Sequence, residues 1–128
     1  MTSQDPRHLE GDRAESFVAD QLIHSGWQVL ARKLRTPYAE VDLLVIPPDG
    51  QHLVVVEVKA RHTLSWGEPR ESLGWRQHAR LARALEYLAM RMAWPHEVRL
   101  DLCFVEVLAG KPVAWQHIDA LESPTRGR

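Results

Sequence analysis

Acidic residues inside two apolar stretches are the first candidates for chemistry. Asp42 lies in the run Glu40–Ile46, and Glu57 lies in the run Leu53–Lys59, which reads LVVVEVK. Burying a carboxylate without a partner is costly, so these positions call for an explanation beyond core packing. Glu57 and Lys59 are two residues apart, and the period of a strand places both side chains on one face. With Asp42 on the neighbouring strand, they predict a partly buried site of two carboxylates and one amine.

A third carboxylate, Glu15, lies in a predicted helix. On a helical wheel it falls between Leu22 and Ala19, inside the apolar arc, so we expect it to face the sheet. Three inward carboxylates, Glu15, Asp42 and Glu57, repel one another, and a divalent cation is the simplest agent that makes such a cluster tolerable. Hard oxygen ligands favour Mg²⁺ or Mn²⁺, whereas zinc would be expected to bring histidine or cysteine.

The elements that must position these side chains follow from the hydrophobic pattern. A first helix is expected between Asp5-Pro6 and Ser25-Gly26. Turns are expected at 47–50 and 109–112. The other elements are strands at 27–35, 40–46, 53–59, 98–108 and 113–118 and a second helix at 70–92. This order predicts one α/β domain over residues 1–121, with a mixed central sheet flanked by helices and a frayed tail at 122–128. The near-continuous apolar run at 53–59 predicts a central strand.

Positive charge is concentrated on the second predicted helix. Residues 70–92 carry five basic and two acidic side chains, in a chain whose formal net charge is -1. The helix is amphipathic, with an apolar arc of Leu81, Leu85, Leu88 and Met92 opposite an arginine arc of Arg76, Arg80 and Arg83. The arginine arc is either a solvated helix face or a phosphate contact. In the second case the patch would extend to Arg32, Lys33, Arg35 and Arg61.

These motifs resemble a known nuclease superfamily. Asp42, followed by Glu57-x-Lys59 on the next strand, is similar to the core of the PD-(D/E)XK nucleases. More narrowly, the chain resembles the YraN-like family of uncharacterised bacterial proteins. The motifs shared with that family are Gly11-x-x-Ala14-Glu15, Trp66-Gly67-x-Pro69, Arg76-Gln77-x-x-x-Leu81, Arg99-Leu100-Asp101 and Ile118-Asp119-Ala120. The resemblance implies the αβββαβ core of restriction endonuclease-like folds.

The resemblance also implies an activity and roles for these residues. It implies a Mg²⁺- or Mn²⁺-dependent endonuclease acting on DNA, including branched or structured DNA. Asp42 and Glu57 would bind the metal with the main-chain carbonyl of Val58, and Glu15 would complete or support the site. Lys59 would orient the attacking water or help deprotonate it. A carboxylate-held Mg²⁺ suits this reaction because it generates a nucleophile near neutral pH and stabilises charge on the phosphate.

Each of these interpretations has a simpler alternative. Asp42, Glu57 and Lys59 could form a cross-strand ion pair on a solvated face, and Glu15 could pair locally with Arg13. Glu40 shares the face of Asp42 by alternation, as a supporting residue or as an exposed side chain. The rival functions are a non-catalytic nucleic-acid-binding module that keeps the nuclease fold and a protein-interaction domain.

Composition bounds the remaining possibilities. With 128 residues and 14.7 kDa, the chain favours one core, and its balanced charge is unlike that of a strongly basic nucleic-acid coat. The single cysteine, Cys103, excludes an internal disulfide and is expected in the core. No apolar run reaches the length of about 18 residues of a membrane helix, and the acidic N-terminus is unlike a signal peptide. We therefore expect a cytoplasmic protein without membrane contact, and the need to cut two strands is compatible with a homodimer.

Overall fold

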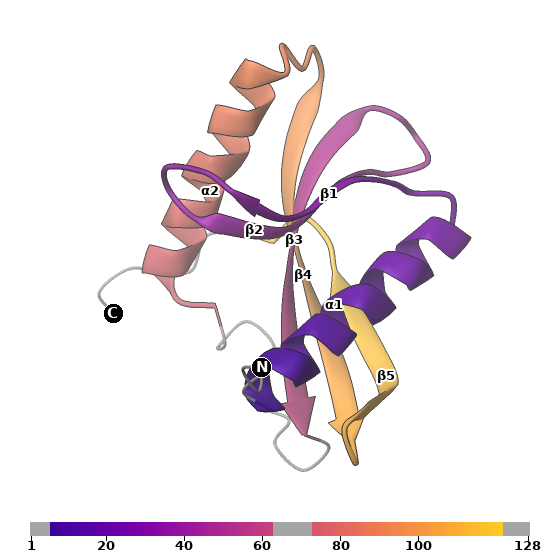
Figure 1. Cartoon of the computed structure of the whole chain (residues 1–128). Coiled ribbons are helices and arrows are strands. Elements are labelled where there is room, and N and C mark those ends of the chain that lie inside the picture. The colour runs from indigo at the N-terminus through magenta and orange to yellow at the C-terminus, as the bar shows by residue number, and fades with distance from the viewer. Residues whose placement is uncertain (1–5, 63–72, 122–128) are drawn as a thin grey trace, which may run out of the picture.

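The computed structural model describes residues 6–62 and 73–121, which form two helices and five strands (Figure 1). In chain order these are α1 (Pro6–His24), β1 (Gln28–Arg35), β2 (Glu40–Ile46), β3 (His52–His62), α2 (Trp75–Arg91), β4 (Glu97–Leu108) and β5 (Lys111–Ile118). The predicted order of elements and the α/β class are confirmed. The predicted tail at 122–128 and the loop containing Trp66 lie outside the described residues.

The strands form one mixed sheet in the order β1-β2-β3-β4-β5. Neighbouring strands are antiparallel except β3 and β4, whose parallel register runs from His52↔Glu97 to His62↔Val107. α2 provides the crossover that a parallel connection requires. β3 is the middle strand, as its apolar run predicts, and it continues to His62, beyond the predicted end at Lys59.

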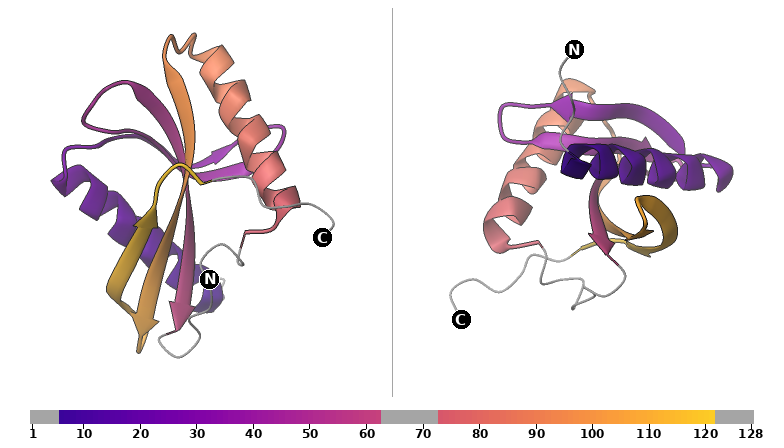
Figure 2. Two further views of the ribbon diagram at one scale, coloured as in Figure 1. Left: turned by 180° about the vertical axis from the view of Figure 1, so that it is seen from behind. Right: turned by 60° about the horizontal axis from the view of Figure 1, so that its bottom comes forward.

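Each face of the sheet is covered by one helix (Figure 2). Val54 and Val56 of β3 belong to the apolar cluster that contains the buried residues of α1. Leu53 and Val55 belong to the cluster that contains the buried residues of α2. Because side chains alternate along a strand, this pattern places Glu57 on the α2 face of the sheet.

The boundaries of α2 differ from the prediction of 70–92. The helix begins at Trp75, after Gly74, whose extended backbone (φ -70°, ψ 165°) makes it the N-cap. Glycine has a high entropic cost inside a helix, which favours a boundary at this position. At the other end, Met92 is the C-cap and is 42% exposed, so the buried arc of the helix ends at Leu88 instead of Met92.

The turn between β4 and β5 is tighter than the predicted 109–112. Ala109 (φ 51°) and Gly110 (φ 77°) form a two-residue connection in the left-handed region, and β5 begins at Lys111. Pro112 is therefore part of the strand, paired with Val107. A proline is tolerated there because β5 is an edge strand and has one side without a ladder partner.

Asp101 is a fully buried carboxylate that joins β4 to β5 and to the chain that follows. It accepts hydrogen bonds from Arg99 Nε (2.9 Å) and Nη2 (3.0 Å) and from the main-chain N–H of Ala120 (3.0 Å), and His117 Nε2 lies 2.8 Å away. Burial alone would raise the pKa of Asp101, but the hydrogen bonds with His117 and Arg99 lower it. Cys103 is fully buried in the cluster under α1, as predicted, and burial raises the pKa of its thiol.

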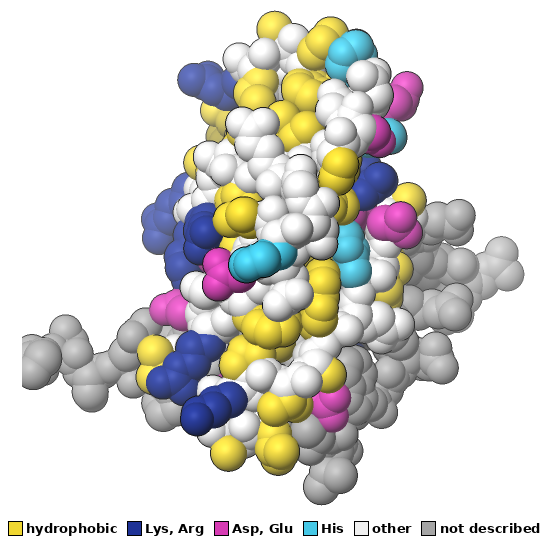
Figure 3. All heavy atoms as spheres, turned by 90° about the vertical axis from the view of Figure 1, so that its right-hand side faces the viewer, with side chains coloured by type: hydrophobic (Ala, Val, Ile, Leu, Met, Phe, Trp, Pro, Cys, Tyr) yellow, Lys and Arg dark blue, Asp and Glu magenta, His cyan; other side chains and the backbone are white. Residues whose placement is uncertain are grey.

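The surface on the side opposite α2 is chemically mixed (Figure 3). Hydrophobic side chains run through the middle of this view, with histidine and acidic side chains among them, and most Lys and Arg side chains lie toward one edge. Leu108 and Val113 of the β4–β5 hairpin are both more than half exposed. No helix in the described part of the chain is long and apolar enough to cross a membrane.

Candidate functional site

The site is at a fork where β2 and β3 separate. The β2–β3 ladder pairs Leu43 with Val56 and does not continue to the next pair, Asp42 and Glu57. Instead, the main-chain N–H of Val58 donates a hydrogen bond to Asp42 Oδ2 at 2.8 Å. A side-chain carboxylate thus satisfies a backbone donor at the end of the ladder, and this bond holds Asp42 in place.

Glu57 is buried at the fork, with its carboxylate held between a strand and a helix. Its side chain faces α2, where Gln77 Nε2 donates a hydrogen bond to Glu57 Oε2 at 2.7 Å. Lys59 Nζ lies 3.5 Å from the same oxygen. The predicted placement of Glu57 and Lys59 on one face is therefore what the structure shows. The pair is not on an open sheet face, because Glu57 is only 7% exposed.

The carboxyl groups of Asp42 and Glu57 lie within hydrogen-bonding range of one another. Burial, followed by the hydrogen bond and the charge of Asp42, raises the pKa of Glu57 to about 8, and Lys59 opposes this only in part. At neutral pH, without a cation, the pair therefore retains a proton. Two oxygen-rich groups that cannot both ionise at low cost are the kind of donor pair that a divalent cation stabilises.

Glu15 approaches the fork from α1 and is 8% exposed, so its predicted inward orientation is correct. Burial, followed by the negative charge of Asp42, raises its pKa to about 7. Its ion pair is with Lys33 Nζ, 3.7 Å away, and not with Arg13, which donates to the carbonyl oxygen of Gly110 instead. Glu15 therefore belongs to the electrostatic surroundings of the two paired carboxylates.

The donor set fits magnesium or manganese in its chemistry. Asp42 and Glu57 offer carboxylate oxygens, and no histidine or cysteine contacts them among the hydrogen bonds and ion pairs described. Within residues 6–62 and 73–121, no group of three or more His, Cys, Asp or Glu side chains is gathered as ligands for one ion. The residues that would hold a cation are thus Asp42 and Glu57, with Glu15 as their acidic neighbour.

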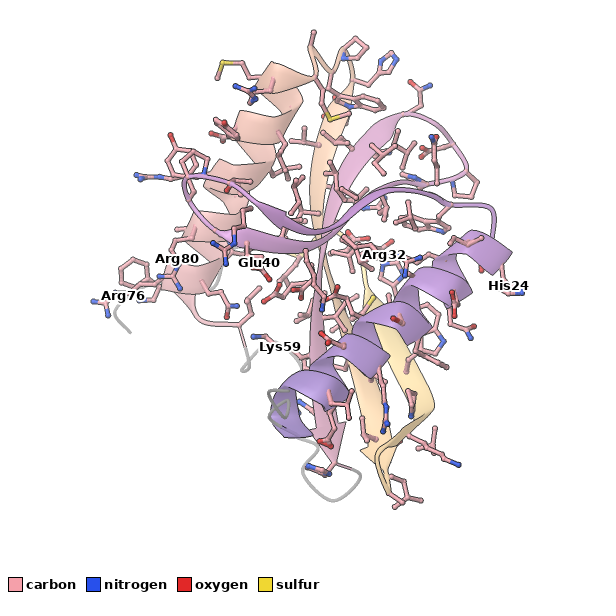
Figure 4. The ribbon with its side chains drawn as sticks, in the orientation of Figure 1. His24, Arg32, Glu40, Lys59, Arg76 and Arg80 are labelled. Carbon is pink, nitrogen blue, oxygen red and sulfur yellow. The ribbon has the colours of Figure 1, made fainter. Side chains whose placement is uncertain are left out.

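A hollow of about 200 Å³ lies beside Glu57. Its lining includes Gln77 and Arg80 of α2 and Glu40 of β2. In Figure 4 the labelled side chains of Glu40 on β2 and Arg80 on α2 lie next to one another, and Lys59 of β3 lies below them. Glu40 is half-exposed at the rim, and its Oε2 lies 3.8 Å from Arg35 Nε. The hollow therefore adjoins the Glu57 and Glu40 carboxylates on one side and the Arg80 guanidinium on the other.

The predicted basic residues divide into two groups. Arg76, Arg80 and Arg83 are exposed on α2, as predicted. Lys33 is instead paired with Asp12 and Glu15 of α1, and Arg61 lies 4.4 Å over the ring of Phe104. The helix arginines are therefore open to solvent, whereas Lys33 and Arg61 have contacts within the fold.

Sequence reasoning assigned no role to Gln77, the helix partner of Glu57. The available signal was its spacing: Gln77 is one turn before the buried Leu81 on the same side of α2. The ion pair between Lys33 and Glu15 was also missed. Lys33 has a left-handed backbone (φ 49°), a conformation that β-strand patterns do not predict.

The candidate site lies in a region that matches a family profile. Residues 14–107 match the profile of the uncharacterised protein family UPF0102, a range that includes Glu15, Asp42, Glu57, Lys59 and Gln77. The chain belongs to this family. The resemblance to the YraN-like group is thereby confirmed. The family description states no activity, so membership alone assigns none.

Individual relatives carry the same description. The chain is 44% identical over 80 residues to a UPF0102 protein of Bordetella avium, covering 62% of this chain and 54% of that one. It is 35% identical over 103 residues to a UPF0102 protein of an Arthrobacter species, covering 80% and 82%. It is 45% identical over 101 residues to a UPF0102 protein of Parvibaculum lavamentivorans, covering 77% and 69%. This chain thus spans about half the length of the Bordetella relative and more of the other two.

The raised pKa values predict an unusual pH dependence of stability. In the folded protein the pKa of Glu57 is about 8 and that of Glu15 is about 7, compared with an ordinary value of 4.5. Both groups therefore bind a proton more tightly in the folded state than in the unfolded state. Their contribution to stability is complete below about pH 4.5 and is lost as the pH rises through 7 and 8. We expect the melting temperature of the chelated protein to fall between pH 6 and 9, by about 3–6 °C for each kcal/mol lost.

Two comparisons check this pH prediction. Asp42→Asn should flatten the pH dependence because it removes the carboxylate next to Glu57, whereas Glu40→Gln at the exposed rim should leave it unchanged. Mn²⁺ at saturating concentration should raise the melting temperature most at high pH. A melting temperature that stays level between pH 6 and 9 in the chelated protein would contradict the assignment.

Proposed function

We propose that this protein is a metal-dependent nuclease that hydrolyses phosphodiester bonds of DNA, including branched or structured DNA. The observation that carries the proposal is the pairing of the buried carboxyl group of Glu57 with the half-buried carboxyl group of Asp42, with Lys59 Nζ 3.5 Å from Glu57. A cross-strand pair that served stability alone would not place two carboxylates together in a partly buried site. Lys59 and Arg80, which lie beside Glu57, supply the positively charged side chains that a phosphate substrate needs.

The residues of the chain divide the work of such a reaction. Asp42 and Glu57 would hold Mg²⁺ or Mn²⁺, which when bound supplies a nucleophile near neutral pH and charge stabilisation at the phosphate. Lys59 would orient the attacking water and offset negative charge in the transition state. Gln77 holds the Glu57 carboxylate in one orientation, and Arg80 would position the phosphate in the adjoining hollow.

Cleavage of defined DNA substrates tests the proposal. Purified protein would be incubated with end-labelled linear, flapped and four-way DNA in Mg²⁺, in Mn²⁺ and in chelator. We expect metal-dependent products from at least one substrate. An absence of cleavage on all substrates, with DNA binding preserved and no Mn²⁺ bound at millimolar concentration, would favour the non-catalytic binding module instead.

Loss of the Gln77 hydrogen bond gives a second, smaller expected effect. Gln77→Leu keeps the approximate volume of the side chain but removes the donor to Glu57 Oε2. Groups that orient a metal ligand contribute about 10- to 100-fold to metal affinity or activity, and we expect a loss in that range. Mn²⁺ titration and cleavage rates measure it. Gln116→Leu, at an exposed position of β5, is the matched control and should change neither.

A further inference from the structure

One side of α2 carries a continuous row of basic and aromatic side chains. Their spacing of three and four residues places them above one another on the helix surface. The row, named here the α2 stripe, consists of Arg76, Arg80, Arg83, Tyr87 and Arg91. Its four arginines are exposed. A row of guanidinium groups on one helix face complements the regular negative charge of a nucleic-acid backbone.

An exposed aromatic ring lies against the C-terminal part of the α2 stripe. Tyr38, in the turn between β1 and β2, packs edge to face against Tyr87 with ring centroids 6.0 Å apart. The guanidinium of Arg91, at the end of the stripe, lies over the Tyr87 ring, 5.5 Å from its centroid. Tyr38 is nevertheless 43% exposed, so part of its ring surface is available to a ligand.

The turn that presents Tyr38 is held by its own hydrogen bonds. Thr36 Oγ1 accepts from the main-chain N–H groups of Tyr38 (3.2 Å) and Ala39 (3.0 Å) and donates to the carbonyl oxygen of Ala39 (2.7 Å). The same turn lies beside α2 in Figure 1. The ring is therefore presented in a defined position, which lowers the entropic cost of stacking a ligand on it.

The α2 stripe also reaches the candidate site. Arg80 lines the hollow beside Glu57, and its position next to Glu40 is visible in Figure 4. From Arg80 to Tyr87 the helix rises about 10 Å. A backbone with one phosphate in the hollow could thus follow the arginines and bring a neighbouring base to Tyr38. Only an unpaired base has a face free to stack there, because bases in a duplex are already stacked.

We propose that the α2 stripe and Tyr38 together bind an unpaired DNA strand, with a base stacked on Tyr38 and phosphates held by the arginines. The inference names the substrate class of the proposed nuclease and rests on that function for what happens to the strand. Binding itself needs neither metal nor cleavage. The two proposals can therefore fail separately.

Fluorescence anisotropy in chelator tests the inference with the full chain. The probes are a labelled oligo(dT) and a blunt duplex of equal length, and we expect tighter binding of oligo(dT). Stacking on one aromatic ring contributes about 1–3 kcal/mol per base, so Tyr38→Leu should weaken oligo(dT) binding about 5- to 150-fold. Tyr38→Phe should retain most of the affinity, because it keeps the ring.

A charge variant supplies an independent readout. Arg83→Ala should weaken binding and reduce the slope of log affinity against log salt by about one, as expected for one lost phosphate contact. Lys111→Ala, exposed on β5 and distant from α2 in the sheet order, is the matched control and should change neither quantity. Equal salt slopes for the wild type and Arg83→Ala would overturn the role of the stripe.

The remaining outcomes separate the rival explanations. Equal affinity for duplex and single strand, or unchanged binding by Tyr38→Leu, would overturn the inference. Tighter binding of oligo(rU) would assign the surface to RNA, and equal competition by polyglutamate would assign it to an acidic protein. Preferential single-strand binding without cleavage would overturn only the proposed nuclease activity, whereas metal-dependent cleavage without that preference would overturn only this inference.

Discussion

Asp42→Asn should reduce metal-dependent DNA cleavage by about 100- to 1,000-fold, the scale seen when one preorganised charge-stabilising group is lost. The substitution keeps the size of the side chain and removes the charge that, with Glu57, would hold the cation. It leaves an amide oxygen that can still accept from the Val58 N–H, so the end of the β2–β3 ladder should remain intact. Glu57→Gln should have an effect of similar size, because both carboxylates serve one site.

Folding and contamination are controlled in the same experiment. Asp42→Asn removes the repulsion that arises when Glu57 ionises, so above about pH 8 its melting temperature in chelator should equal or exceed that of the wild type. Asp20→Asn, at an exposed position on α1, should cleave at the wild-type rate. Full activity in Asp42→Asn would show that the cleavage comes from another protein or another site, and the proposed mechanism would be wrong.

Asp101→Ala should lower the free energy of unfolding by about 3–5 kcal/mol, the range measured when one member of a buried ion pair is removed. The carboxylate is fully buried and bonds to Arg99, His117 and Ala120. Its removal leaves the Arg99 guanidinium, itself only partly exposed, without its ion-pair partner Asp101 and takes away one of the hydrogen bonds that hold the chain after β5. Urea denaturation followed by tryptophan fluorescence measures the change.

The expected loss of unfolding free energy on replacing Asp101 is much larger than the loss on replacing an exposed acidic residue. Asp20→Ala on α1 should change stability by no more than about 0.5 kcal/mol. Asp101→Asn should fall between the two, because the amide keeps the volume and some of the hydrogen bonds. A loss below about 1 kcal/mol for Asp101→Ala would mean that the buried carboxylate does not stabilise the junction of β4 and β5.

Local pattern was sufficient for much of the fold and part of the site. The composition of β2, rich in Val and Leu, and the apolar run of β3 predicted both strands, and β2 has its predicted bounds. The period of two predicted that Glu57 and Lys59 share a face, and the helical period predicted that Glu15 is buried. These predictions succeed because side-chain direction within one element depends on backbone geometry alone.

Helix and turn limits were less well predicted. The polar residues before Gly74 gave no sign that α2 begins only at Trp75, and the Pro112 of an edge strand was assigned to a turn. Such limits depend on what the neighbouring elements cover and on which strand lies at an edge. Composition reports neither.

The sequence by itself thus determined the order of the elements, the central strand and the inward direction of the carboxylates. Only the tertiary structure decided what these carboxylates contact. The β2–β3 ladder ends at Asp42, Gln77 donates a hydrogen bond to Glu57, and Lys33 forms an ion pair with Glu15. These contacts join residues distant in the chain. Their formation depends on how the helices and the twisted strands pack, which no single periodicity encodes.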